Sequence, residues 1–400
     1  MAYSAISISP AIHAYFLSQT TATATAEPAA KTQSVKVAQV VADFINAAQH
    51  SIQIAIYDFR LNGESEKLVI DVLDKQTTAG RTVQIAYDHS KDGKTGEYFA
   101  ALGSDPAPSG THEKMTALHR KNSKIQVKPI VGPKLAAQIV LEPIETGGHL
   151  MHSKYILRDA GTPQAALLIG SANFTDDAWA LQENNILTYI GASTLVKFYE
   201  ADFEELWKSE KIAGTGKKDT GDATIGLPIH VMFSPGNGAA IEEEIGKRIA
   251  AAKHRLAIAS MVISSEHILS ALADKISAVP AFKGIYDSGE MDMVVKLWKS
   301  HSSSKSANGK MTSGDKAALF EKIAKHLHAK KSTKYSDTGP HDFMHNKLVV
   351  IDDQVITGSF NFSTSATHNA ENVVFIESKD IADKYEKYVD SLLAQYKTMG

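Results

Sequence analysis

The sequence predicts an α/β protein built from two tandem, pseudo-symmetric halves. Three sequence blocks occur twice in the same order: H-x-K-x4-D, then G-S-x-N-F, then Glu-Asn. They occupy residues 152–159, 170–174 and 183–184 in the first half, and 345–352, 358–362 and 371–372 in the second. The interval between copies is nearly constant, since it changes only from 193 residues at the histidines to 188 at the glutamates. Such an interval indicates an internal duplication with small insertions, not a solenoid of short repeats.

The first half opens with a strand–helix–strand pattern. Apolar residues at helical spacing over 37–45 predict a helix, and residues 51–59 alternate as a strand. Residues 68–73 predict a second helix, and residues 83–87 a strand that ends at Asp88. A strand, a helix and a second strand in this order favour a parallel pair with a crossover connection.

The second half repeats this pattern and closes in the same way. Its predicted elements are a helix over 241–249, a strand over 256–262, a helix over 268–276 and a strand over 284–286 that ends at Asp287. Each half then ends in an amphipathic helix, over 195–207 in the first and 381–396 in the second. These apolar stripes are typical of core packing.

Composition shifts mark the expected boundaries. We expect a low-complexity lead-in at 1–33, a first domain at 34–208, a polar Gly-rich linker at 209–226 and a second domain at 227–400. Two long insertions precede the repeated histidines. The first contains the apolar segment Pro129 to Pro143, and the second contains the basic segment Lys305 to Lys334. Both insertions lead into the histidine hairpins, so we expect them near the site.

Composition also excludes several kinds of site. The chain of 400 residues has no cysteine, which excludes disulfides, thiolate metal sites and cysteine nucleophiles. A formal net charge of −3 does not favour nonspecific nucleic-acid binding. No run approaches the ~18 apolar residues of a membrane helix. No Lys or Arg precedes the N-terminal apolar stretch, which argues against a signal peptide. We therefore slightly favour the cytoplasm and leave secretion open.

The repeated motif suits the cleavage of a phosphodiester. Strand alternation places His152 with Lys154, and His345 with Lys347, on one face of each hairpin. Two facing hairpins would form a pocket with two imidazoles and two ammonium groups. One histidine can attack phosphorus while the other protonates the leaving alkoxide, and the lysines hold the phosphate. This chemistry requires no metal and no cofactor. The amides of Asn173 and Asn361 and the hydroxyls of Ser171 and Ser359 are the expected additional phosphate ligands.

On these two intact motifs, the sequence resembles the phospholipase D superfamily over roughly residues 35–400. The resemblance implies two α-β-α sandwich domains with the active site at their interface. It also implies that Glu183 and Glu371 each orient one histidine, that His152 is the nucleophile and that His345 is the general acid and base. The pseudo-symmetry leaves the order of the two histidines open. Asp159 and Asp352 are expected to be structural and to bind turn amides.

Three functions agree with the sequence. The first is a phospholipase D that hydrolyses phospholipids to phosphatidic acid and headgroup through a phosphohistidine, with transfer to an alcohol as a linked activity. It would touch membranes peripherally through the apolar Pro129 to Pro143 segment. The second is a nuclease whose basic segment Lys305 to Lys334 follows a phosphate backbone and whose Tyr335 or Phe343 stacks on bases. The third is a non-catalytic binding protein. A monomer suffices, because the duplication supplies both halves of the site.

Overall fold

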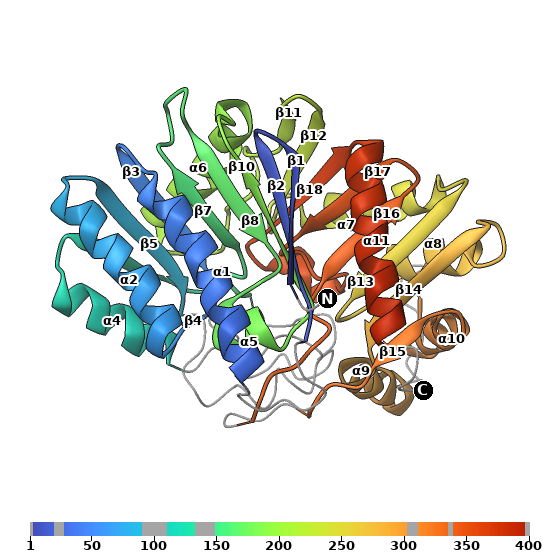
Figure 1. The fold of residues 1–400 in the computed structure, drawn as a ribbon. Helices are drawn as coiled ribbons and strands as arrows, with labels where there is room; N and C mark the ends of the chain where they lie inside the picture. Colours follow the sequence, from blue (N-terminus) through green and yellow to red (C-terminus); the bar gives the residue numbers. More distant parts are fainter. Residues whose placement is uncertain are drawn as a thin grey trace.

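The chain folds into two mixed α/β halves that lie side by side (Figure 1). The computed structural model describes residues 3–19, 28–89, 110–132, 149–301, 311–334 and 339–396. Each half contains an eight-stranded sheet with helices on both faces, which confirms the predicted fold class. Most of the Pro129 to Pro143 segment, Lys305 and Tyr335 lie outside the described residues.

The first half contains the sheet with strand order β1-β2-β10-β8-β7-β3-β5-β6. Its strands are β1 Tyr3–Ser9, β2 Ile12–Leu17, β3 Ser51–Ile56, β5 Thr82–Asp88, β6 Ile125–Ile130, β7 Lys154–Arg158, β8 Ala166–Gly170 and β10 Asn184–Tyr189. The short strands β4 Phe59–Arg60 and β9 Phe174–Thr175 pair with each other. Its helices are α1 Pro28–Asn46, α2 Gly63–Thr78, α4 Thr111–Lys121, α5 Asp176–Ala180 and α6 Ser193–Ser209.

The second half repeats this arrangement with strand order β11-β12-β18-β17-β16-β13-β14-β15. Its strands are β11 Gly221–Thr224, β12 Pro228–Ser234, β13 Arg255–Ser260, β14 Ala281–Asp287, β15 His328–Lys330, β16 Lys347–Ile351, β17 Gln354–Gly358 and β18 Glu371–Glu377. Its helices are α7 Gly238–Ala250, α8 Glu266–Lys275, α9 Ser288–Ser300, α10 Ser313–Ala324, the 3-10 helix η1 Thr364–His368 and α11 Lys379–Tyr396. The predicted parallel pairs are present as β3 with β5 and β13 with β14.

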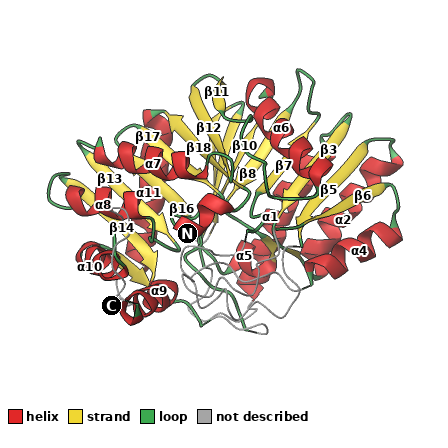
Figure 2. Ribbon diagram, turned by 180° about the vertical axis from the view of Figure 1, so that it is seen from behind, coloured by secondary structure: helices red, strands yellow, loops and turns green. Residues whose placement is uncertain are grey.

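The helices divide the apolar core into layers. Helices α1 and α2 cover one face of the first sheet and α6 the other, while α7 and α8 cover one face of the second sheet and α11 the other (Figures 1 and 2). Residues of α6 and α11 belong to one buried cluster that also takes side chains from both sheets. The outer helices pack in separate clusters, one for each half. The α6 and α11 stripes are therefore core, as predicted, and they join the two halves.

Two predicted boundaries differ from the structure. Part of the expected N-terminal lead-in forms the hairpin β1–β2, and β2 adds to the first sheet beside β10. The reason is apolar alternation, because Ile12, Ala14 and Phe16 point into the core and Phe16 stacks on Tyr388 of α11 with ring centroids 4.6 Å apart. Part of the expected linker likewise forms β11, which pairs with β12 at the corresponding edge of the second sheet.

Candidate active site

Two antiparallel hairpins carry the repeated motif, β7–β8 in the first half and β16–β17 in the second. His152 and His345 each stand two residues before the first strand of their hairpin. The backbone beside each histidine is bonded to the opposite half. The N–H of His152 donates to the carbonyl oxygen of Ala370 at 2.9 Å, and the N–H of Glu183 donates to Phe343 at 3.3 Å. These bonds bring the two motifs together along one seam.

A buried aspartate at the end of the parallel strands fixes the approach to each histidine. Asp88, the last residue of β5, accepts the N–H of Met151 at 2.7 Å. Asp287, the last residue of β14, accepts the N–H of Met344 at 2.8 Å. Burial raises the pKa of Asp287 to about 6, although hydrogen bonds from Ser332 and the backbone oppose the shift. The two aspartates therefore position equivalent turns of the chain.

His152 is paired with a carboxylate from the second half. Its Nδ1 lies 2.8 Å from Oε2 of Glu371, and both side chains are fully buried. The other carboxylate oxygen, Oε1, accepts a hydrogen bond from the side-chain amide of Asn369 at 3.1 Å. Because the carboxylate of Glu371 accepts a hydrogen bond from Nδ1, that nitrogen carries the proton. Nε2 is therefore the atom of His152 that can react. The ring of Tyr57 packs edge-on against His152 at 4.7 Å.

His345 has an amide as the partner of its Nδ1. This nitrogen lies 3.0 Å from Oδ1 of Asn184, the first residue of β10. The orientation of that amide is fixed, because its Nδ2 donates to the carbonyl of Ala178 at 3.0 Å and to Oε1 of Gln182 at 3.2 Å. Its Oδ1 also accepts the hydroxyl of Ser171 at 2.7 Å. His345 must therefore donate from Nδ1, and its chemistry also falls to Nε2.

The predicted role of Glu183 differs from its position in the structure. The sheet register pairs Ile186 with Gly170 and Val373 with Gly358, so Asn184, and not Glu183, occupies the position of Glu371. One extra residue before β10 in the first half produces this offset. Glu183 instead binds Lys330, whose Nζ lies 2.6 Å from its Oε2.

The two motif lysines follow their histidines closely. Nζ of Lys154 donates to the carbonyl oxygen of His152 at 2.6 Å, and Nζ of Lys347 donates to that of His345 at 2.8 Å. Nζ of Lys154 also lies 5.0 Å from the ring centroid of Tyr57. Each ammonium group carries three protons, so a bond to the carbonyl leaves donors for other partners. Both lysines are buried beside the histidines, where their charge acts in a medium of low dielectric constant.

The remaining predicted ligands fall into two groups. The hydroxyl of Ser171 donates to Asn184 and accepts the N–H of Asn185, so it supports β10 and does not point its proton at a phosphate. Ser359 accepts the N–H of Asn372 at 3.0 Å in the same manner. Asn173 and Asn361 are nearly buried, and Oδ1 of each has no hydrogen-bond partner within the described residues. The hydroxyl proton of Ser171 is thus used within the fold, while binding of a phosphate by Ser359, Asn173 and Asn361 stays a prediction.

Asp159 and Asp352 lie at the hairpin turns, where a structural role was predicted. Asp159 accepts the backbone N–H groups of residues 49–51, and Asp352 those of residues 253–255. Burial alone would raise the pKa of Asp352, but the N–H groups of Arg255, His254 and Lys253 outweigh it and lower the pKa. Both aspartates have positive φ, +55° and +48°, a conformation that short polar side chains tolerate.

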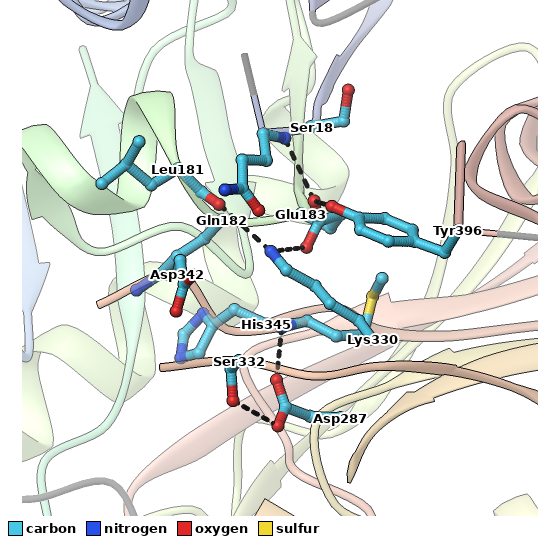
Figure 3. A network of polar contacts seen from close by, with 12 residues as sticks. Ser18, Leu181, Gln182, Glu183, Asp287, Lys330, Ser332, Asp342, His345 and Tyr396 are labelled. Atoms are coloured by element: carbon cyan, nitrogen blue, oxygen red, sulfur yellow. Dashed lines mark hydrogen bonds and ion pairs between the residues drawn. The ribbon is translucent and has the colours of Figure 1, made fainter. Parts of the chain in front are cut away.

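Lys330 was not predicted as a site residue. It is the last residue of β15, is 1% exposed, and reaches Glu183 across the boundary between the halves (Figure 3). Its Nζ also donates to the carbonyl of Leu181 at 3.2 Å. In the sequence Lys330 is one of two adjacent lysines in a basic segment, after the short stretch His328-Ala329. Nothing in the sequence distinguishes it from its neighbours Lys331 and Lys334, which are exposed.

The described residues contain no group of three or more His, Asp or Glu side chains placed to hold a metal ion. Within the same residues, no helix is both long and apolar enough to cross a membrane.

Comparison with known proteins gives matches of three kinds. A family model described as "Cardiolipin synthase, PLD-like domain" matches residues 41–207 and 245–393, which is most of both halves. A phospholipase D of Rickettsia prowazekii is 44% identical over 75 residues, which cover 18% of this chain and 36% of the relative. A phospholipase D of Rickettsia bellii is 43% identical over 76 residues, which cover 18% and 37%. The matched stretch therefore spans about a third of these relatives' length.

The solved structure of phosphatidylserine synthase from Haemophilus influenzae has a TM-score of 0.58 against this chain. The alignment covers 94% of this chain and 87% of that one at 10% sequence identity. At this identity the likeness concerns the fold, which the two proteins share along nearly their whole length.

Proposed function

The chain belongs to the phospholipase D-like family of phosphodiesterases, and from this premise we propose that it is a metal-independent phospholipase D. Its reaction would hydrolyse a phospholipid to phosphatidic acid and a free headgroup alcohol through a phosphohistidine. The observation that carries the proposal is the pair of buried histidines whose Nδ1 atoms are hydrogen-bonded to the opposite half, His152 to Glu371 and His345 to Asn184. This arrangement directs Nε2 of both rings to the chemistry.

In the first step Nε2 of neutral His152 attacks phosphorus. The bond from phosphorus to the headgroup oxygen breaks, and protonated His345 gives its Nε2 proton to that oxygen. In the second step a water molecule gives a proton to His345 and its oxygen attacks phosphorus. The bond between phosphorus and His152 breaks, which releases phosphatidic acid and restores both histidines. Lys154 and Lys347 supply positive charge to the phosphoryl oxygens throughout.

A paired turnover assay in EDTA tests the proposal. Purified protein is incubated with phosphatidylcholine and phosphatidylglycerol vesicles, and separately with fluorescent single-stranded DNA and RNA. We expect headgroup release from vesicles, and none with His152→Asn. Cleavage of nucleic acid alone would replace the proposal with the nuclease alternative. No turnover of either substrate would favour a non-catalytic binding protein, and a requirement for a divalent metal would contradict the mechanism.

The order of the two histidines can be tested with bis(p-nitrophenyl) phosphate. Its p-nitrophenolate group leaves without protonation, so the first step does not need the general acid. His345→Asn should therefore release a burst of one p-nitrophenolate per protein and retain the phosphorylated histidine, because the base for water attack is missing. His152→Asn should give no burst. The opposite pattern would exchange the roles of the two residues.

A further inference from the structure

The partners of the two catalytic histidines occupy the same position in the two sheets but differ in charge. Glu371 is the first residue of β18 and Asn184 is the first residue of β10, two residues before the paired positions Val373 and Ile186. The backbone agrees with this equivalence. The residue before each partner, Ala370 or Glu183, donates its N–H to the approach segment of the opposite motif, at Leu150 or Phe343. A carboxylate therefore serves His152 where an amide serves His345.

This difference matches the different electrostatic needs of a nucleophile and an acid. An attacking imidazole acquires positive charge as its bond to phosphorus forms, and a carboxylate at Nδ1 stabilises that charge. A general acid begins as imidazolium and must release its proton to a poor leaving group. An amide oxygen orients such a ring without adding a counter-charge that would hold the proton. The observed hydrogen-bond partners thus suit His152 as the nucleophile and His345 as the acid.

A second asymmetry concerns Glu183, the residue before Asn184. Lys330 is paired with Asp287 in the β14–β15 ladder, and the matching position in the first half, opposite Asp88, is Ile130. The second half thus has a buried ammonium where the first half has an apolar side chain. Glu183, next to Asn184, is held by that ammonium at 2.6 Å.

Two further hydrogen bonds hold the carboxylate of Glu183 in place. Its Oε1 accepts the N–H of Gln19 at 3.0 Å and the hydroxyl of Tyr396 (Figure 3). Burial, followed by the charge of Glu183, raises the pKa of Tyr396 far above its usual range, so this hydroxyl is always a donor. Three donors from three separate segments therefore hold the carboxylate that adjoins the partner of His345.

We propose that Asn184 is a positioning residue that fixes the tautomer of His345 while giving it no counter-charge, and that Lys330 sequesters Glu183 so that the amide keeps this role. The inference rests on the proposed function, because it assigns unequal parts to two histidines of one phosphodiesterase site. Neither Asn184 nor Lys330 needs to touch the substrate. Both act through His345.

Among the described residues, the other charged groups to consider near His345 are one ammonium group and three carboxylates. Nζ of Lys347 donates to the backbone carbonyl oxygen of His345 at 2.8 Å and brings a positive charge. The carboxylate of Glu371 is paired with His152, and that of Asp287 is bonded to the backbone of Met344 and to Ser332. Asp342 accepts the N–H of Thr333 at 2.6 Å. Each of these carboxylates thus has another partner.

Dependence on the leaving group tests the proposal. Asn184→Asp places a carboxylate at Nδ1 of His345, and Glu371→Gln is the matched variant that removes one from His152. General acid catalysis contributes about 10²- to 10⁴-fold, so a weaker acid should slow alkoxide release from phosphatidylcholine by about 10- to 100-fold. The first step with bis(p-nitrophenyl) phosphate needs no acid, so Asn184→Asp should leave the rate of the first p-nitrophenolate release nearly unchanged. Glu371→Gln should slow both substrates.

The same variants give a readout that a merely structural role would not move. In Asn184→Asp the midpoint of the alkaline limb of the pH profile for phosphatidylcholine should move up by about one pH unit. The reason is that a nearby negative charge makes His345 hold its proton to higher pH. An unchanged pH profile, or an equal loss on both substrates, would overturn the proposal. Should the wild type turn over neither substrate, the proposed function fails. Imidazole ¹⁵N NMR tests the inference even in that case, because the titration midpoint of His345 should rise by about one pH unit in Asn184→Asp.

A further variant guards against misfolding. An aspartate at position 184 cannot donate to Ala178 and Gln182 as the amide does, and this loss lowers stability. Asn184→Ala introduces no charge. It should lower kcat on phosphatidylcholine by about 10- to 100-fold with little change in KM and no rise of the alkaline limb. Full retention of kcat in this variant would also overturn the proposal.

Discussion

Replacing Asp219 with asparagine should stabilise the protein at neutral pH. Asp219 is fully buried in the segment between the halves, and neither carboxylate oxygen has a hydrogen-bond donor within the described residues. It lies beside the carboxyl of Asp202 on α6, which accepts the hydroxyl of Tyr155 at 2.6 Å. Burial, and then the charge of Asp219, raise the pKa of Asp202 well above its usual range. The structure thus buries two carboxyl groups that cannot both ionise at low cost.

The expected stabilisation follows from the shift in the pKa of Asp219. Burial is the main reason that its pKa rises from 3.8 to about 6. Each pKa unit corresponds to about 1.4 kcal/mol, so ionising this group costs the folded state about 3 kcal/mol. Because the folded pKa is raised, the folded state binds more protons than the unfolded state between about pH 4 and pH 6. The free energy of unfolding of the wild type therefore falls through this window as pH rises.

Urea denaturation at pH 4 and pH 7.5 measures the effect. The free energy of unfolding of Asp219→Asn minus that of the wild type should increase by up to about 3 kcal/mol between the two values. Asp274→Asn, at an exposed position near the end of α8, is the control for loss of one carboxylate. The reasoning would be refuted by a difference that does not change with pH, or by a variant that loses relative stability as pH rises.

Three further predictions concern the groups that build the site. Lys330→Met should lower the free energy of unfolding by about 3–5 kcal/mol because it leaves the Glu183 charge buried without its counter-ion, and adding Glu183→Gln should restore most of it in urea denaturation. Asp352→Asn should be less stable than the wild type at pH 7, and the difference should shrink as pH falls towards 3, because the pKa of Asp352 is lowered and its contribution disappears on protonation; an undiminished difference at pH 3 would contradict this. Gly170→Ala would place a Cβ 2.2 Å from the carbonyl oxygen of Asn185, so we expect the free energy of unfolding in urea to fall by about 1–3 kcal/mol and turnover to slow. Wild-type values of both would show that the backbone of β10 can shift to accommodate the methyl group.

Features governed by local periodicity could be predicted from the sequence. The strand–helix–strand units, the two hairpins and the closing helices all follow from apolar spacing, and the structure has them where they were expected. The duplication itself was evident because the repeated residues keep their order. The edge hairpin β1–β2 was missed, although Ile12, Ala14 and Phe16 alternate. Strand β2 lies between the edge strand β1 and β10, and β10 is far along the chain, so local sequence does not reveal this pairing.

The hydrogen-bond partners of the two histidines could not be predicted in the same way. Counting from Ser171 and Ser359 aligns Glu183 with Glu371, but one residue inserted before β10 shifts the register. In a strand a shift of one residue turns every side chain to the other face, so it decides whether Asn184 or Glu183 meets His345. No local sequence signal shows where in a turn the extra residue is accommodated.

Duplication creates a chemical problem that this asymmetry addresses. Two identical halves would present two histidines with equal partners, and equal partners would favour equal protonation, whereas attack on a phosphodiester needs one neutral ring and one charged ring at the same time. One amide in place of a carboxylate gives the two rings unequal partners, and the lysine that stands in place of Ile130 binds Glu183, the residue next to that amide. A variant with carboxylates at both positions, Asn184→Asp, should hold the proton of His345 more tightly, so its pH profile for phosphatidylcholine should be displaced towards higher pH. A profile that coincides with that of the wild type would show that the partner at Nδ1 does not set the proton affinity of His345.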